Sequence, residues 1–180
     1  MGWSTLPTVS GALPDIILGQ SNFTSIRFNG GGLSANSMAY PTDVCSTASR
    51  FAVVDTHNSR ILLWNSVPTA SNQTPNVVLG QTSMTTRTAR YAQAGLYYPY
   101  GCTISGTKLL VADSVNSRIL IWNTWPTAND QTPNLVLGQA SLTTATDAAG
   151  STGLYTPYGV YTNGTQVWVA DAGNNRVLGW

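Results

Sequence analysis

The stretch VADSVNSRILIW at residues 111–122 decides how this chain folds. It reads as a short apolar strand, a polar turn and a second apolar strand. The same pattern occurs 58 residues upstream as VVDTHNSRILLW (53–64) and 58 residues downstream as VADAGNNRVLGW (169–180). Self-similarity at a fixed period of this length predicts a repeat architecture.

The repeat extends well beyond this motif. The segment that follows it, WN…P…QTPN…VLGQ, occurs at 64–81 and again at 122–139. A weaker copy runs from Trp3 to Gln20, at an offset of 61 residues instead of 58. Three extra residues therefore lie between Gln20 and Pro41. We place this insertion at 29–32 (NGGG), because a loop tolerates added residues at low cost. We divide the single repeat domain 1–180 into units of approximately 3–63, 64–121 and 122–180.

The composition favours strands and tight turns. Hydrophobic residues make up 42% of the chain and charged residues only 8%; all seven acidic residues are Asp, and Lys108 is the only lysine. Strong helix formers are therefore scarce, whereas Thr, Val, Tyr, Asn, Ser and Gly are abundant. A net charge of +1 provides no field to attract nucleic acid or anionic lipid. The chain is predicted to be all-β.

The composition and the first residues also bear on the location of the protein. A composition low in charge and rich in Thr, Asn, Tyr and Trp is common among secreted and cell-surface β proteins, so it favours one of these two locations. The first residues lack the basic and apolar regions of a signal peptide, so the protein either stays inside the cell or has lost a leader. No apolar run is long enough to span a bilayer.

Each unit is expected to contribute four short strands. In the middle unit these are an inner strand at 100–105, strands at 109–113 and 118–123, and an outer strand at 134–139. The runs at 109–111 and 119–121 are apolar on both faces, so these strands must be covered on both sides, as in sheets that stack on one another. Four-stranded units stacked at a fixed period predict a β-propeller.

The repeated residues resemble the NHL repeat, in which Pro-x-Gly opens a unit and Asp-x-x-Asn-x-Arg follows its second strand. The matches are PYG at 99–101 with the motif from Asp113, and PYG at 157–159 with the motif from Asp171. The first unit departs from the pattern, because Asp43 stands where the others have Gly. The resemblance covers essentially the whole chain and implies a propeller that commonly has six blades.

Three blades per chain predict a homodimer. A propeller needs at least four blades, and the chain begins and ends at the same phase of the repeat, since Gly2 and Trp3 align with Gly179 and Trp180. The third blade therefore lacks an outer strand, whereas 15–20 is an outer strand without a blade. We expect 15–20 of each copy to complete the third blade of its partner in a six-bladed ring. The alternative is a piece cut or engineered from a longer repeat protein, which would dimerise for the same reasons.

The two cysteines are interpreted as unpaired thiols. Cys102 aligns with apolar Val44 and Val160, whereas Cys45 aligns one position later, with Thr103. Because successive side chains alternate across a strand, the two cysteines should point to opposite faces. We therefore expect neither a disulfide nor a metal role for them.

The charged motif that occurs in every unit is interpreted as structural. Its Asp can accept hydrogen bonds from turn N–H groups, its Asn tolerates a left-handed backbone, and its Arg can reach back to the carboxylate. A motif that occurs in every unit is better explained by a structural role in each unit than by a single active site. The residues are Asp55, Asn58 and Arg60; Asp113, Asn116 and Arg118; and Asp171, Asn174 and Arg176.

Functional residues are expected at positions where the three repeat units differ in sequence. His57 is the only histidine, and one His per subunit cannot build the His-rich metal site of the lyases that the NHL resemblance includes. No cofactor is expected. Asp43 near the channel mouth is a candidate to hold a cation on the axis, and an enzyme is the less favoured interpretation. Some NHL domains bind RNA through a basic face, but here the basic cluster is confined to one loop, at Arg87 and Arg90 with Tyr91. The candidate ligand-binding residues are Asp43, His57, Arg87, Arg90, Tyr100 and Tyr158.

The favoured function is therefore a rigid binding or scaffold module. Tyr side chains with Asn and Thr suit stacking on, and hydrogen bonding to, sugars or polar peptides. The expected partners are a second copy of the chain and a protein, peptide or glycan ligand, with no membrane and no nucleic acid. The alternatives on the same fold are a metal-assisted, lyase-like enzyme and an RNA-binding NHL domain.

Overall fold

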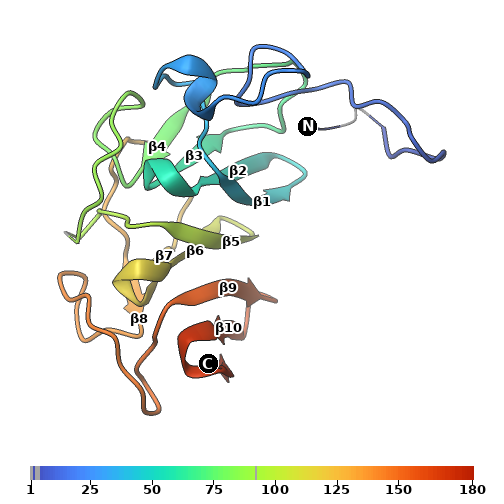
Figure 1. Ribbon diagram of the computed structural model, residues 1–180. Helices are drawn as coiled ribbons and strands as arrows, with labels where there is room; N and C mark the ends of the chain where they lie inside the picture. The colour runs from blue at the N-terminus through green and yellow to red at the C-terminus, as the bar shows by residue number, and fades with distance from the viewer. Residues whose placement is uncertain (1, 3–4, 92) are drawn as a thin grey trace.

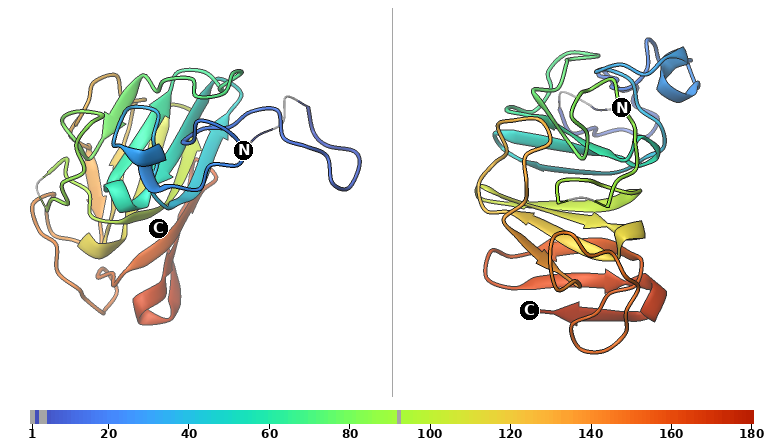
Figure 2. Two further views of the ribbon diagram at one scale, coloured as in Figure 1. Left: turned by 45° about the horizontal axis from the view of Figure 1, so that its top comes forward. Right: turned by 90° about the vertical axis from the view of Figure 1, so that its left-hand side faces the viewer.

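The computed structural model describes residue 2, residues 5–91 and residues 93–180 (Figure 1). The chain folds into three antiparallel sheets joined by loops and short 3₁₀ turns, which confirms the all-β prediction. The sheets stack in chain order, and the two ends of the chain lie at opposite ends of the stack (Figure 2). Trp3, which the repeat aligns with Trp64, lies outside the described residues.

The strands follow the predicted period closely. The first sheet contains β1 (Pro41–Thr47), β2 (Arg50–Asp55), β3 (Arg60–Trp64) and β4 (Val77–Leu79). The second sheet contains β5 (Pro99–Ser105), β6 (Lys108–Asp113), β7 (Arg118–Trp122) and β8 (Leu135–Leu137). The third contains β9 (Pro157–Thr162), β10 (Val167–Asp171) and β11 (Arg176–Gly179).

The polar centre of the motif forms a 3₁₀ turn in every unit. These turns are η2 (Thr56–Asn58), η3 (Ser114–Asn116) and η4 (Ala172–Asn174); a fourth, η1 (Phe28–Gly31), lies in the loop before β1. The left-handed residue is the one after the motif Asn, at Ser59, Ser117 and Asn175 with φ near 50°. The sequence predicts this conformation for the motif Asn itself, but the residue that follows the Asn adopts it. The Asn side chain instead donates a hydrogen bond to the carboxylate of the motif Asp.

The hydrophobic core lies between the sheets. One cluster joins the first and second sheets through residues such as Val54, Ile61 and Val111. A second cluster joins the second and third sheets through residues such as Leu110 and Ile119. Alternate residues of β6 and β7 thus face opposite neighbours, so the middle sheet is covered on both sides, as its continuous apolar runs predicted.

Among the described residues, segment 15–20 forms no strand. It makes two isolated bridges, from Ile16 to Gly2 and from Gly19 to Ser37. A strand needs a continuous neighbour, and the described residues beside this segment provide only the single bridging residues Gly2 and Ser37. In the described residues the third sheet has three strands, ending at β11.

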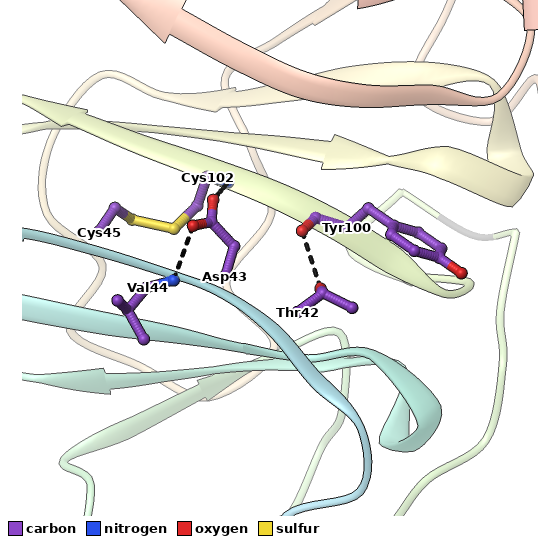
Figure 3. Close-up of a disulfide and its surroundings, with 6 residues drawn as sticks. All are labelled: Thr42, Asp43, Val44, Cys45, Tyr100 and Cys102. Carbon is purple, nitrogen blue, oxygen red and sulfur yellow. Dashed lines mark hydrogen bonds between the residues drawn. A yellow bond between two sulfur atoms is a disulfide. The ribbon is translucent and has the colours of Figure 1, made fainter. Parts of the chain in front are cut away.

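The expectation of two free thiols is wrong, because Cys45 and Cys102 form a disulfide (Figure 3). The side chains do point to opposite faces of equivalent strands, as predicted. However, one strand, β1, belongs to the first sheet and the other, β5, to the second. Opposite faces of consecutive sheets meet when the sheets stack, with the two Cα atoms 5.9 Å apart.

No helix in the described part of the chain has the length and apolar character needed to cross a membrane.

Candidate functional site

The repeated Asp, Asn and Arg residues form one hydrogen-bonded frame per sheet. In the second sheet, the Asp113 carboxylate accepts from Asn116 Nδ2 at 2.8 Å and from Arg118 Nε at 2.7 Å. It also accepts from the backbone N–H of Tyr97 at 2.8 Å. The Arg118 guanidinium continues to the carbonyl of Gly95 at 2.8 Å. One carboxylate therefore ties the turn, β7 and the preceding loop together.

The first and third sheets repeat this geometry. Arg60 Nε lies 2.7 Å from the Asp55 carboxylate and Arg176 Nε lies 2.8 Å from that of Asp171. Burial raises the pKa of Asp55 and Asp113 above the ordinary value, although the adjacent guanidinium groups and the hydrogen bonds oppose the shift. The Asp55–Arg60 and Asp113–Arg118 side chains are completely buried, which supports the structural interpretation of the motif.

His57 lies in a row of aromatic rings at the end of the sheets that carries the 3₁₀ turns. Its ring stacks on Tyr40 at a centroid distance of 4.4 Å and on Tyr98 at 5.2 Å. Tyr40 also packs at a tilt against Phe28 at 5.4 Å, and Tyr98 packs against Tyr97 at 5.2 Å. We call Phe28, Tyr40, His57, Tyr98, Tyr97 and Tyr91 the aromatic row; Tyr91 meets Tyr97 edge to face.

The sequence interpretation identified His57 but missed Phe28, Tyr40 and Tyr98. Tyr40 and Tyr98 are one repeat apart, and both hold a positive φ, of 51° and 46°, immediately before an inner strand. This bend directs the two rings to the same end of the stack as His57. The signal available in the sequence was an aromatic residue before each of the prolines that open β1 and β5.

Tyr100 and Tyr158 form a separate pair on the inner strands. Their rings stack at 4.5 Å with planes 12° apart, because β5 and β9 lie side by side. In the first sheet Thr42 takes this position and donates its hydroxyl to the carbonyl of Tyr100 at 2.8 Å (Figure 3). The two tyrosines predicted as ligand-binding residues are thus brought together, apart from the aromatic row.

The structure separates the two arginines of the predicted basic cluster. Arg90 forms an ion pair with Asp130 and donates to the carbonyl of Gly80 at 2.8 Å. Arg87 is exposed and lies at the rim of a shallow depression formed with the loop around η1. Arg90 therefore joins two loops, whereas Arg87 faces solvent.

This depression, which we call the arginine depression, has a volume of about 650 Å³. Arg27 and Arg87 contribute two cationic side chains to it, and no acidic residue lines it. Phe28 connects it to the aromatic row and is largely exposed. Its lining residues are Ile26, Arg27, Phe28, Asn29, Gly31, Gly32, Leu33 and Arg87.

Asp43 joins two sheets. Its carboxylate accepts from the backbone N–H of Cys102 in β5 at 2.9 Å and from that of Val44 at 2.8 Å (Figure 3). It lies beside the disulfide, where β5 and β9 have Gly101 and Gly159 in its place. Within the described residues, no three His, Cys, Asp or Glu side chains come close enough together to hold a metal ion.

No family model matches this chain, and none of the curated proteins matches it. Solved structures similar to it include the crystal structure of the computationally designed Ika4 protein. That chain is 9% identical to this one; the match covers 82% of this chain and 94% of that chain, with a TM-score of 0.37.

Proposed function

We propose that this protein is a rigid binding module for an acidic glycan. We further propose that its frame is an NHL-like β-propeller of six four-stranded blades, closed by two copies of the chain. The observation that supports the binding role is the arginine depression, where two cationic side chains and an exposed aromatic ring share one surface.

The chemistry of the depression favours a sugar that carries a carboxylate or a sulfate. An exposed ring such as Phe28 can pack on the apolar C–H face of a pyranose. The guanidinium groups of Arg27 and Arg87 can hold an anionic oxygen pair through two parallel hydrogen bonds. With no carboxylate among the lining residues, an anion meets no repulsion there.

The frame supports a ligand site of fixed shape. The loop before β1, which supplies all of the lining residues except Arg87, is anchored at two points: Arg60 donates to the carbonyl of Ser37 at 2.7 Å, and Asn58 Nδ2 donates to Asn29 Oδ1 at 2.7 Å. A site held in place before binding loses less conformational entropy when the ligand arrives.

The disulfide supports a location in an oxidising compartment. Disulfides persist in secreted and cell-surface proteins and are rare in the reducing cytosol. This agrees with the proposed glycan ligand, so we propose a secreted or cell-surface protein.

The proposal is tested with a glycan array followed by titration calorimetry. We expect saturable binding of a uronate-containing or sulfated oligosaccharide and at least about tenfold weaker binding of its neutral parent, since one charge-assisted bidentate contact contributes on the order of 1.5–3 kcal/mol. Phe28→Ala and Arg87→Ala should each weaken binding by about tenfold or more. Tyr155→Ala, which removes an exposed ring from the third unit, is the matched control and should bind normally.

Two results would overturn this proposal. Equal affinity for the neutral and the acidic sugar would remove the role of the arginines. Saturable binding of single-stranded RNA or of a peptide, with no sugar binding, would assign the depression to that ligand class instead. RNA is the less favoured ligand because Arg90, the second arginine of the loop, is already paired with Asp130.

A further inference from the structure

The outer face of the third sheet carries apolar residues whose equivalents in the other sheets are covered. Trp168, Ala170 and Val177 are exposed, with Val177 at 65% of its maximal area. One repeat upstream, the equivalent residues of the second sheet are fully buried against the third sheet: Leu110, Ala112 and Ile119. Two repeats upstream, those of the first sheet are fully buried against the second sheet: Ala52, Val54 and Ile61.

The opposite end of the stack has the complementary surface. An apolar cavity of about 300 Å³ lies on the outer face of the first sheet, and Val44, Phe51, Val53 and Val67 contribute to its walls. One repeat downstream, their equivalents all belong to the core between the first and second sheets: Cys102, Leu109, Val111 and Trp125. The cavity is therefore bounded by residue positions that elsewhere in the chain contact a neighbouring sheet.

Segment 15–20 holds the position of a fourth strand beside this cavity. Ile16 and Leu18 line the cavity, and Ile17 O accepts from Asn72 N at 2.8 Å, as Val78 O accepts from Asp130 N at 2.9 Å. The bridge from Gly19 to Ser37 likewise matches the bridges at Gly80 and Gly138. Segment 15–20 is thus held on its outer side by the same contacts that hold β4. On its inner side β4 pairs with β3, whereas among the described residues segment 15–20 has no such sheet beside it.

We propose that the outer face of the third sheet of one copy packs into this cavity of a second copy. β11 then pairs with segment 16–18 of that copy, and Gly179 takes the position that Gly2 holds beside Ile16. The proposal specifies the interface of the ring put forward under Proposed function and rests on that ring. The occupant is a second copy because the same sheet-on-sheet packing occurs twice within the chain.

The disulfide fixes the register of this interface. Cys45 of β1 faces Cys102 of β5, so one repeat later Thr103 takes the position facing Val160. One repeat after that, Tyr161 takes the position facing Val44 of the second copy. Both residues are 59% exposed in the single chain, as expected of positions that lack their neighbour.

At the proposed interface, the large residue and the small residue lie on opposite sides from where they lie in the core between the first and second sheets. The core between the first and second sheets combines the small Ala52 with the large Trp125. At the proposed interface the equivalent of Ala52 is the large Trp168, and the equivalent of Trp125 is the smaller Val67. A large residue on one side replaces a large residue on the other, so the total volume is roughly maintained, as close packing requires.

The test is a pair of designed disulfides compared by native mass and non-reducing electrophoresis. Val44→Cys combined with Tyr161→Cys should give a covalent dimer that a reductant separates. Thr103→Cys combined with Val160→Cys is the matched control, because it repeats the same geometry inside one chain and also places a cysteine next to Cys102. It should form an intramolecular disulfide and no covalent dimer.

The outcomes separate this interface from the ring and from the glycan site. An unmodified protein that stays monomeric at high concentration would refute both the ring and the interface. A native dimer whose Val44→Cys, Tyr161→Cys variant does not cross-link, while the control disulfide forms, would refute this interface alone. Neither result depends on sugar binding.

A second variant guards against misfolding of the cysteine variants. Val177→Arg places a charge on the proposed interface, where burying it is costly, and should raise the dimer dissociation constant at least about tenfold. Val115→Arg, at a half-exposed position on η3, is its control and should dimerise normally. Normal dimerisation of Val177→Arg would overturn the proposal.

Discussion

The first three strands of the second sheet and the three strands described for the third sheet follow the same sequence pattern, but they are buried to very different degrees. In the second sheet the Asp113 and Arg118 side chains are fully covered, whereas in the third the Arg176 side chain is 29% exposed. The hydrogen-bond geometry is nevertheless almost identical. The motif therefore sets its own local geometry, and the neighbouring sheets decide how much that geometry contributes to stability.

The largest expected difference concerns the repeated carboxylate. Asp113→Ala removes the carboxylate that neutralises the buried Arg118 guanidinium and should lower the free energy of unfolding by about 3–5 kcal/mol. Asp171→Ala should cost only about 1–3 kcal/mol, because Arg176 can reach water. Urea denaturation at low protein concentration measures both, and equal losses would contradict the importance of burial.

An intermediate effect is expected for the apolar position that follows the motif. Ile119→Ala opens a cavity in the core between the second and third sheets and should cost about 2–5 kcal/mol. In dilute solution, where the third sheet is not covered by a second copy, its equivalent Val177→Ala alters an exposed side chain and should change stability by at most about 0.5 kcal/mol. A stability loss in Val177→Ala that grows with protein concentration would show that a second copy covers the third sheet.

The smallest effect is expected at the glycines of the inner strands. A Cβ at Gly101 would lie 2.4 Å from the carbonyl oxygen of Tyr158, so Gly101→Ala must move β5 away from β9 and should cost about 1–3 kcal/mol. A Cβ at Gly159 would meet only the Ala170 Cβ, at the ordinary distance of 3.7 Å. In dilute solution, Gly159→Ala should therefore unfold at the same temperature as the unmodified protein. If both variants lose stability equally, the close approach of β5 and β9 is not the reason that Gly occupies position 101.

Much of the fold could be predicted because the pattern is repeated. The strands of the middle unit begin and end within one or two residues of the predicted positions, and the two-sided apolar runs of β6 and β7 required covered faces. Segment 15–20 meets the described backbone of its own chain only at isolated bridges, and its pairing with a partner chain stays a prediction.

The candidate site could be predicted only in fragments. His57 was recognised because it interrupts the repeat, but Phe28 and Arg27 lie in the loop before β1, where the repeat gives no reference. Arg87 and Arg90 are close in sequence, and nothing in their spacing indicated that one would pair with Asp130 while the other faced solvent.

The sequence by itself determined the strands, the turns and the Asp–Asn–Arg frame, because these depend on interactions within one unit that recur at a fixed spacing. The tertiary structure alone decided which faces meet. The alternation of side chains placed Cys45 and Cys102 on opposite faces of equivalent strands, and only the stacking of the first sheet on the second made those faces adjacent. The same stacking brought His57 between Tyr40 and Tyr98 and left the outer face of the third sheet uncovered.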